Sequence, residues 1–320
     1  MIVITGAAGF IGSYLAGWWA DRGRTDLVLV DDFSNDAKRP NWTARRHARR
    51  LDRDDAPAAL TEMAPDIEAV VHLGARTDTL ERDTTLLDRL NTQSTVAWWR
   101  FCTEHGIPLL YASSAAVYGN GDLGYGEEAD LDALAPLNAY GQSKLDADRH
   151  VLDQEAAPPL RAGVRLFNVY RPNEYHKGRM ASVVLHATRQ ARSNGVVKLF
   201  RSHRADCADG EQTRDFVDVR DVARVIDHFV AHRPPSGIYN LGTGTDRSFN
   251  DLARAVFTAL DIDERIEYFD MPADLRDQYQ YHTRADIAKL RAAGYDARFT
   301  TLEDGVMRYV RRYLTAPGIH

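Results

Sequence analysis

The stretch that decides the fold is Ile2-Val3-Ile4-Thr5-Gly6-Ala7-Ala8-Gly9-Phe10-Ile11-Gly12. Its first four residues are apolar or β-branched and predict a short buried strand. A helix is predicted to follow as far as about Arg22, with Leu15 on its buried face. Glycines between a strand and a helix allow a tight turn and close approach of the backbone to a pyrophosphate, which the helix N-terminus attracts. The spacing is Gly-x-x-Gly-x-x-Gly, and it predicts a dinucleotide site.

Further apolar runs repeat this alternation of strand and helix along the first half of the chain. We expect strands at residues 27–30, 49–52, 69–72, 108–112 and 162–167. Strands that alternate with helices indicate a parallel sheet with helices on both faces. The sequence therefore predicts an α/β protein with a Rossmann doubly wound parallel sheet over residues 1–167, to which residues 214–242 contribute later. Residues 168–320 are expected to form mainly a smaller C-terminal α/β substrate lobe.

The residues after the second predicted strand give conflicting signals about the cofactor. Asp31 and Asp32 stand about 20 positions after the glycines, where an acidic residue suits the ribose hydroxyls of NAD. Lys38 and Arg39 follow shortly and could receive the 2′-phosphate of NADP. The cofactor is therefore predicted to be NADP or NAD, and the choice stays open. Asp52, at the end of the third predicted strand, is a candidate contact for the adenine amino group.

The composition limits the class of protein. The chain has 320 residues, 44% of them hydrophobic and 27% charged, which is ordinary for a soluble globular protein. A net charge of −6 argues against a partner that is a nucleic acid or an anionic membrane. Two cysteines, Cys102 and Cys207, provide neither a disulfide framework nor a CxxC metal site. With neither a secretory signal nor a membrane-spanning run in the sequence, we expect a cytoplasmic protein without a metal.

A second motif points to catalysis. Tyr140 and Lys144 lie four residues apart in a predicted helix, so their side chains share one face. Ser114 ends the fifth predicted strand and could hydrogen-bond the same substrate oxygen. An ammonium and a positive nicotinamide ring would both favour the tyrosine phenolate. The three side chains suit removal of a proton from an alcohol while a hydride leaves its carbon.

Taken together, these motifs resemble the extended short-chain dehydrogenase/reductase family. The resemblance rests on the glycine turn, Ser114, Tyr140 with Lys144, Asn168-Val169-Tyr170 and Arg214-Asp215-Phe216. It implies a Rossmann domain and a C-terminal lobe that binds a nucleotide sugar. Sugar dehydratases of the family carry an Asp-Glu pair after the serines, where this chain has Ala115-Ala116. Because loss of water needs an acid at that place, the resemblance disfavours dehydration and favours an epimerase.

Within that family the sequence is most similar to the ADP-glycero-manno-heptose 6-epimerases. The shared stretches include His176-Lys177-Gly178, Lys198-Leu199-Phe200 and Asn240-Leu241-Gly242. The likeness implies a homo-oligomer that acts on an ADP-linked heptose, with Lys177 as a second acid/base group opposite Tyr140. Only five of the 40 basic residues are lysine, and a lysine, unlike an arginine, can give up its proton.

The resemblance also implies the remaining site residues, position by position. The catalytic set is Ser114, Tyr140, Lys144 and Lys177. The expected cofactor contacts are Gly6, Gly9, Phe10, Ile11, Gly12, Asp31, Asp32, Lys38, Asp52, Leu73, Ala75, Asn91, Tyr140 and Lys144. The expected substrate contacts are Ser113, Asn168, His176, His186, Lys198, Phe200, Arg214 and Tyr279.

Several residues depart from the family pattern where the sugar is expected to bind. Arg76, Arg171, Tyr175 and Arg179 replace smaller or different side chains, and all are expected to face the sugar. The sugar and the carbon that reacts therefore stay open. The alternatives are a C3- or C4-epimerase of a nucleotide sugar, a net oxidoreductase, and a non-catalytic NAD(P)-binding sensor. The intact Ser114, Tyr140 and Lys144 argue against the sensor.

Overall fold

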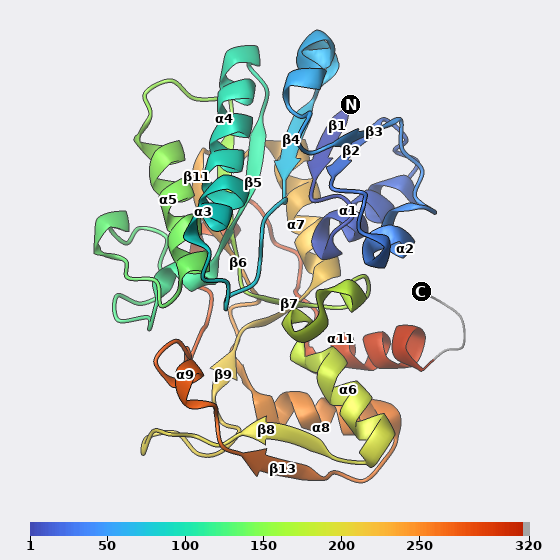
Figure 1. Ribbon diagram of the computed structural model, residues 1–320, viewed down its shortest axis with the longest axis vertical. Helices are drawn as coiled ribbons and strands as arrows, with labels where there is room; N and C mark the ends of the chain where they lie inside the picture. Colours follow the sequence, from blue (N-terminus) through green and yellow to red (C-terminus); the bar gives the residue numbers. More distant parts are fainter. Residues whose placement is uncertain (316–320) are drawn as a thin grey trace.

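The computed structural model describes residues 1–315 and is built on one seven-stranded sheet (Figure 1). All its strands are parallel, in the order β3-β2-β1-β4-β5-β6-β11. They are β1 Ile2–Thr5, β2 Leu27–Asp31, β3 Arg49–Asp52, β4 Ala69–His72, β5 Leu109–Ser114, β6 Arg161–Leu166 and β11 Gly237–Leu241. This confirms the predicted doubly wound α/β fold.

Helices cover both faces of this sheet because alternate strand residues point to opposite sides. On one face Ile2 and Ile4 pack with α1 and α7; on the other, Val3 packs with α4 and α5. The α-helices are α1 Phe10–Ala20, α2 Arg39–Trp42, α3 Thr84–Leu87, α4 Ser94–His105, α5 Ala139–Asp153, α6 Val183–Asn194, α7 Val219–His232, α8 Phe249–Leu260, α9 Ala273–Arg276, α10 Ala288–Ala292 and α11 Leu302–Tyr309. Within residues 1–315, every helix is too short or too polar to cross a membrane.

Tighter or wider helical turns connect several of these elements. The 3₁₀ segments are η1 Asp36–Lys38, η2 Ala58–Asp66, η4 Ala115–Tyr118, η5 Leu131–Ala133 and η6 Tyr175–Met180. Two π-helical segments are η3 Asp88–Gln93 and η7 Val310–Leu314. The helical stretch over residues 84–105 is thus divided into α3, η3 and α4. A π turn often occurs at functional sites, and η3 carries Asn91.

A second packed region lies below the carboxyl edge of the main sheet in Figure 1. Its core is formed by α6, α8 and α11 against β8 Val197–Phe200, which pairs in parallel with β13 Ile266–Phe269. Two small sheets join it to the main one. They are β7 Asn168–Tyr170 with β10 Phe216–Asp218, and β9 Thr213–Arg214 with β12 Arg247–Ser248. The carboxyl ends of the main strands therefore face this region, and ligands of such sheets bind at that edge.

Candidate active site

The glycine turn between β1 and α1 is packed so closely that a side chain at Gly6 or Gly12 would collide with the backbone. Gly6 has φ +64°, and a Cβ there would lie 2.8 Å from the Leu73 carbonyl carbon. A Cβ at Gly12 would lie 2.3 Å from the Gly6 carbonyl oxygen. Helix α1 begins without a side-chain cap, so its first N–H groups remain free to bind an anion. These features fit the pyrophosphate of a dinucleotide.

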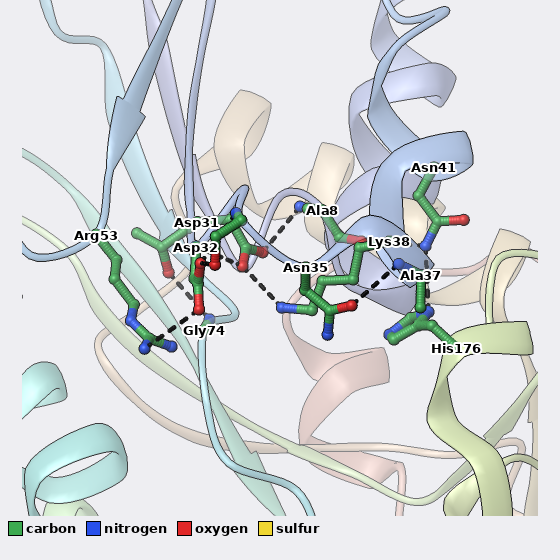
Figure 2. Close-up of polar contacts among 12 residues, drawn as sticks. Ala8, Asp31, Asp32, Asn35, Ala37, Lys38, Asn41, Arg53, Gly74 and His176 are labelled. Carbon is green, nitrogen blue, oxygen red and sulfur yellow. Dashed lines mark hydrogen bonds and ion pairs between the residues drawn. The ribbon is translucent and has the colours of Figure 1, made fainter.

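Asp31 at the end of β2 is bonded to the protein through both carboxylate oxygens (Figure 2). Oδ2 accepts a 2.8 Å hydrogen bond from the Ala8 amide in the glycine turn, and Oδ1 accepts one of 2.9 Å from the Lys38 ammonium. Asp31 thus fixes the turn to β2 and draws Lys38 to the cofactor edge. Its contact with a ribose hydroxyl remains a prediction.

Asp32 stands beside a cation that the sequence analysis missed. The Arg53 guanidinium lies 3.5 Å from Asp32 Oδ2, while Oδ1 accepts from the amide and hydroxyl of Ser34. Arg53 directly follows Asp52, which pairs in register with Asp31 and is exposed. Lys38, in η1, therefore contacts Asp31, and Arg53, just after β3, contacts Asp32 (Figure 2). Arg39, at the start of α2, is exposed.

Asn91 is fully buried and acts on the loop after β4 rather than facing open space. Its amide oxygen accepts from the Arg76 amide at 2.7 Å, and its amide nitrogen donates to the Arg76 carbonyl and to the Ser143 hydroxyl. Leu73 and Ala75, in the same loop, are half-buried. The side chain of Asn91 thus holds the loop against α5, and its predicted cofactor contact would be indirect.

Ser114 and Tyr140 meet at the end of β5 and the start of α5. The Asn138 side chain caps α5 by accepting from the Gly141 amide at 2.8 Å, which sets the position of Tyr140 in the first turn. Burial raises the pKa of the Tyr140 phenol, and a hydrogen bond with the Ser114 side chain opposes that rise. The sequence analysis expected the Lys144 ammonium to lower this pKa. In the structure that ammonium is instead bonded to a carbonyl of β5.

Lys144 is buried and donates from Nζ to the Ala112 carbonyl oxygen at 2.9 Å. Burial lowers its pKa to about 8, and the carboxylate of Asp148, one turn later, opposes the shift. Asp148 is itself fully buried and paired with Arg165 at 3.1 Å. The Ser113 hydroxyl also donates to Asp148, at 2.9 Å. Ser113 is therefore engaged behind the site, and we do not retain it among the proposed substrate contacts.

The segment η6 carries Lys177, and a buried carboxylate fixes its start. Glu174 is 1% exposed and accepts hydrogen bonds from the Ser182 hydroxyl at 2.7 Å and the Tyr309 hydroxyl at 3.0 Å. Burial lowers the pKa of Lys177, and the Glu174 charge opposes it. His176 lies 3.3 Å from the Asn41 amide, and burial lowers its pKa to about 4. The sequence analysis missed Glu174, which has no motif of its own.

A cavity of about 400 Å³ lies beside the segments that carry Tyr140 and Lys177. Its lining is mostly polar and comes from the loop after β4, the residues just before Tyr140, η6 and the segment after α9. The lining residues are Thr79, Leu80, Glu81, Arg82, Leu137, Asn138, Ala139, Arg179 and Gln278. The cavity is thus bounded on one side by the residue preceding Tyr140 and on another by the residue two positions after Lys177.

A second group of predicted substrate contacts gathers in the lower region. The Arg214 guanidinium lies 4.9 Å from the Tyr279 ring centre, and the Phe200 and Tyr279 rings are 6.1 Å apart. Arg214 is 7% exposed, and its position is fixed by a hydrogen bond to the Thr213 carbonyl. A guanidinium beside aromatic rings suits a diphosphate and a base.

Three other predicted substrate contacts lie at the ends of neighbouring elements. Asn168 begins β7 and is exposed, as is Lys198 on β8, while His186 is half-buried on α6. Whether they touch substrate remains a prediction.

Arg171 does not face the sugar, which corrects an expectation from the sequence. Its side chain is 4% exposed and donates to both oxygens of Asp218, at 2.7 and 2.9 Å. Asp218 is the N-cap of α7, so the pair secures that helix. The backbone of Arg171 has φ +135°, a conformation that favours glycine. An arginine with this φ is strained, and its side chain is held by the buried ion pair with Asp218.

Comparison with known proteins gives this arrangement a family. Residues 2–242 match the NAD dependent epimerase/dehydratase family. The chain belongs to this family. It is 43% identical to an ADP-L-glycero-D-manno-heptose-6-epimerase of Fusobacterium nucleatum, over 98% of both chains. It is also 42% identical to one from Nitratidesulfovibrio vulgaris, over the whole of both. The resemblance seen in the sequence is confirmed at family level.

Solved structures agree with this membership of the epimerase/dehydratase family. The crystal structure of the Helicobacter pylori ADP-L-glycero-D-manno-heptose-6-epimerase superposes with a TM-score of 0.81 at 28% identity, covering 97% of this chain and 94% of that one. MoeE5 in complex with UDP-glucuronic acid and NAD gives 0.77 at 27% identity, covering 97% and 99%. As an NAD-dependent epimerase/dehydratase, the chain uses a nicotinamide cofactor, and the glycine turn described above fits one.

Proposed function

We propose that this protein inverts C6 of an ADP-linked glycero-manno-heptose. The observation that carries the proposal is a polar cavity lined by Ala139, which precedes Tyr140 in α5, and by Arg179, two residues after Lys177 in η6. Relatives that match the full length of the chain are named for this activity. Two acid/base groups, Tyr140 in α5 and Lys177 in η6, suit a reaction that must handle both stereoisomers.

The proposed reaction divides the proton transfers between two residues. In one direction Tyr140, hydrogen-bonded to Ser114, takes the proton of the C6 hydroxyl as C6 loses a hydride and becomes a ketone. The bound nicotinamide supplies the hydride acceptor and later the donor. The ketone then rotates so that its opposite face meets the nicotinamide. Lys177 protonates the ketone oxygen as the hydride returns to that face. The hydride returns to C6, the proton taken by Tyr140 equals in number the one given by Lys177, and proton exchange with solvent restores both groups for the next turnover.

The other end of the substrate is assigned to the aromatic group in the lower region. Arg214 would neutralise the diphosphate, and its fixed guanidinium needs little reorganisation to do so. Phe200 and Tyr279 would border the nucleoside. Held at the diphosphate, the sugar would extend toward Tyr140 and Lys177 and could still rotate there.

Proton NMR of the purified enzyme with one epimer of ADP-glycero-manno-heptose tests this proposal. We expect the C6 proton signal of that epimer to convert to a mixture of both epimers, with all ring signals unchanged. Inversion at C3 or C4 of the sugar ring would instead assign the protein to another epimerase activity. Accumulation of reduced cofactor in proportion to substrate consumed would make it a net oxidoreductase.

Two properties of the whole protein are part of the proposal. Both cysteines are free and buried, which suits a reducing compartment such as the cytoplasm. A homo-oligomer is expected from the family likeness, and light scattering of the eluting protein would measure its mass.

A further inference from the structure

An ion pair beside the cavity joins two segments that are far apart in sequence. Arg179 Nη2, in η6, lies 2.8 Å from Asp78 Oδ2, in the loop after β4. In Figure 1 that loop descends from β4 toward the level of β7 before the chain turns back into α3. The pair therefore connects the segment that carries Lys177 to the loop after β4.

The loop holds the carboxylate of Asp78 in place for this contact. Its Oδ1 accepts from the Leu80 amide at 3.0 Å, and the side chain is 15% exposed. Arg76 Nη2 lies 3.7 Å from the same Oδ2 and 3.0 Å from Glu81. Partial burial opposes ionisation of Asp78, but bonds from Arg179 and the Leu80 amide lower its pKa overall. The carboxylate of Asp78 is therefore ionised and held in position, and Arg179 forms an ion pair with it.

The loop is in turn bonded to the helix that carries Tyr140. Arg76 exchanges two backbone hydrogen bonds with the Asn91 side chain. Asn91 donates to the Ser143 hydroxyl at 2.9 Å, and Ser143 donates to the Tyr140 carbonyl at 2.7 Å. A path of hydrogen bonds from the backbone of Tyr140 to Arg76 thus continues through the ion pairs of Asp78 with Arg76 and with Arg179, two residues beyond Lys177.

We propose that Asp78 and Arg179 are positioning residues that clasp η6 to the loop after β4 and so set the distance between Tyr140 and Lys177. The inference rests on the proposed epimerase function and adds to it. An exposed ion pair contributes little to global stability, and the Arg179 side chain is 64% exposed. Small displacements of a catalytic group nevertheless cost much in rate, so the clasp acts on turnover rather than on folding.

The test compares Arg179→Ser, Asp78→Asn and the double variant, each as the cofactor-bound enzyme. We expect each single variant to lose about tenfold in kcat with KM little changed, and the double variant to lose no more than either, as for coupled residues. Arg179→Lys keeps the charge and should recover most of the loss. Arg201→Ser is the matched control, because it removes another exposed arginine whose partner, Asp270 at 3.3 Å, lies in the lower region.

Amide hydrogen exchange gives a readout that does not depend on activity. Residues 174–181 should exchange faster in Arg179→Ser and Asp78→Asn than in the wild type and in Arg201→Ser. Wild-type kcat in Arg179→Ser, additive losses in the double variant, or unchanged exchange of residues 174–181 would each overturn the clasp. If the wild type does not epimerise ADP-heptose, the proposed function is wrong, and the exchange rates alone decide whether the clasp exists.

Discussion

The ammonium of Lys144 on α5 is hydrogen-bonded at 2.9 Å to the carbonyl oxygen of Ala112 on β5. Ala112 lies two residues before Ser114, so this bond ties the helix with Tyr140 and Lys144 to the strand that ends in the serine. Lys144 is 2% exposed, and burial lowers its pKa to about 8. It therefore remains mostly protonated at neutral pH, the state in which its predicted contact with the cofactor would be made.

Replacing Tyr140 by phenylalanine should remove turnover but leave cofactor bound. Only the phenol hydroxyl is lost, and a general acid–base group contributes at least about a hundredfold to the rate. Turnover is measured by NMR of ADP-heptose, and cofactor occupancy by absorbance of the purified protein. An activity within about threefold of wild type would contradict the assigned role, since that is below the usual contribution of such a group.

Replacing Lys177 by methionine should abolish net inversion. Methionine keeps the side-chain length but has no proton to transfer. The ketone oxygen therefore cannot be protonated when the hydride returns to the opposite face. From one epimer, slow transfer of the C6 hydride to the cofactor should persist and is measured by absorbance of the reduced nicotinamide.

Lys289→Met serves as the control for that variant. Lys289 is another partly exposed lysine, paired with Glu128 at 2.7 Å outside the cavity lining. Inversion at the wild-type rate in Lys177→Met would show that the second proton comes from elsewhere.

Charge at the cofactor edge should decide between NADP and NAD. Lys38 and Arg53 lie beside Asp31 and Asp32, so their joint removal leaves two carboxylates that repel a 2′-phosphate. We expect Lys38→Ala/Arg53→Ala to weaken NADP by about tenfold or more relative to NAD, the loss of one or two charged hydrogen bonds. Arg39→Ala, at an exposed position, is the control. Equal losses of NADP and NAD in titrations of the apoprotein would exclude this role.

Stability should fall in acid because of His72. The Thr5 hydroxyl accepts from the Gly74 amide and lies 2.7 Å from Nδ1 of the buried His72 imidazole. Burial, and then the Lys144 charge, lower the pKa of His72 to about 3. The unfolded histidine binds a proton near pH 6.5, so stability is full above that pH and declines below it. At pH 5 the loss is about 2 kcal/mol relative to neutral pH.

Chemical denaturation at several pH values measures that decline. His72→Asn should reduce its slope between pH 6.5 and 5, whatever its effect on stability at neutral pH. Exposed His203→Asn should leave the slope as in wild type. An unchanged slope in His72→Asn would show that other groups cause the acid sensitivity.

The fold was predictable because strand and helix alternate with clear apolar runs from Ile2 onward. Seven parallel strands and the helices on both faces follow from that pattern. The wide turn η3 was not predictable, since residues 88–93 keep helical periodicity and the π geometry depends on the contacts of Asn91 with the loop after β4.

The candidate site was predictable where one motif brings its residues together, and much less so where tertiary contacts decide. Tyr140 and Lys144 share a helix, so their spacing sufficed. Arg171 looked like a sugar contact because its ion pair with Asp218 joins positions 47 residues apart. The clasp between Asp78 and Arg179, 101 residues apart, was equally invisible, although both segments were recognised as departures from the family.

The fate of an isotope at C6 tests the central claim most directly. One epimer of ADP-glycero-manno-heptose, deuterated at C6, is incubated with the enzyme in ordinary water and analysed by NMR. Oxidation and return of the same hydride predict that the product is inverted at C6 and keeps its deuterium there. Replacement of that deuterium by solvent hydrogen, or inversion at a different carbon with C6 untouched, would contradict the account.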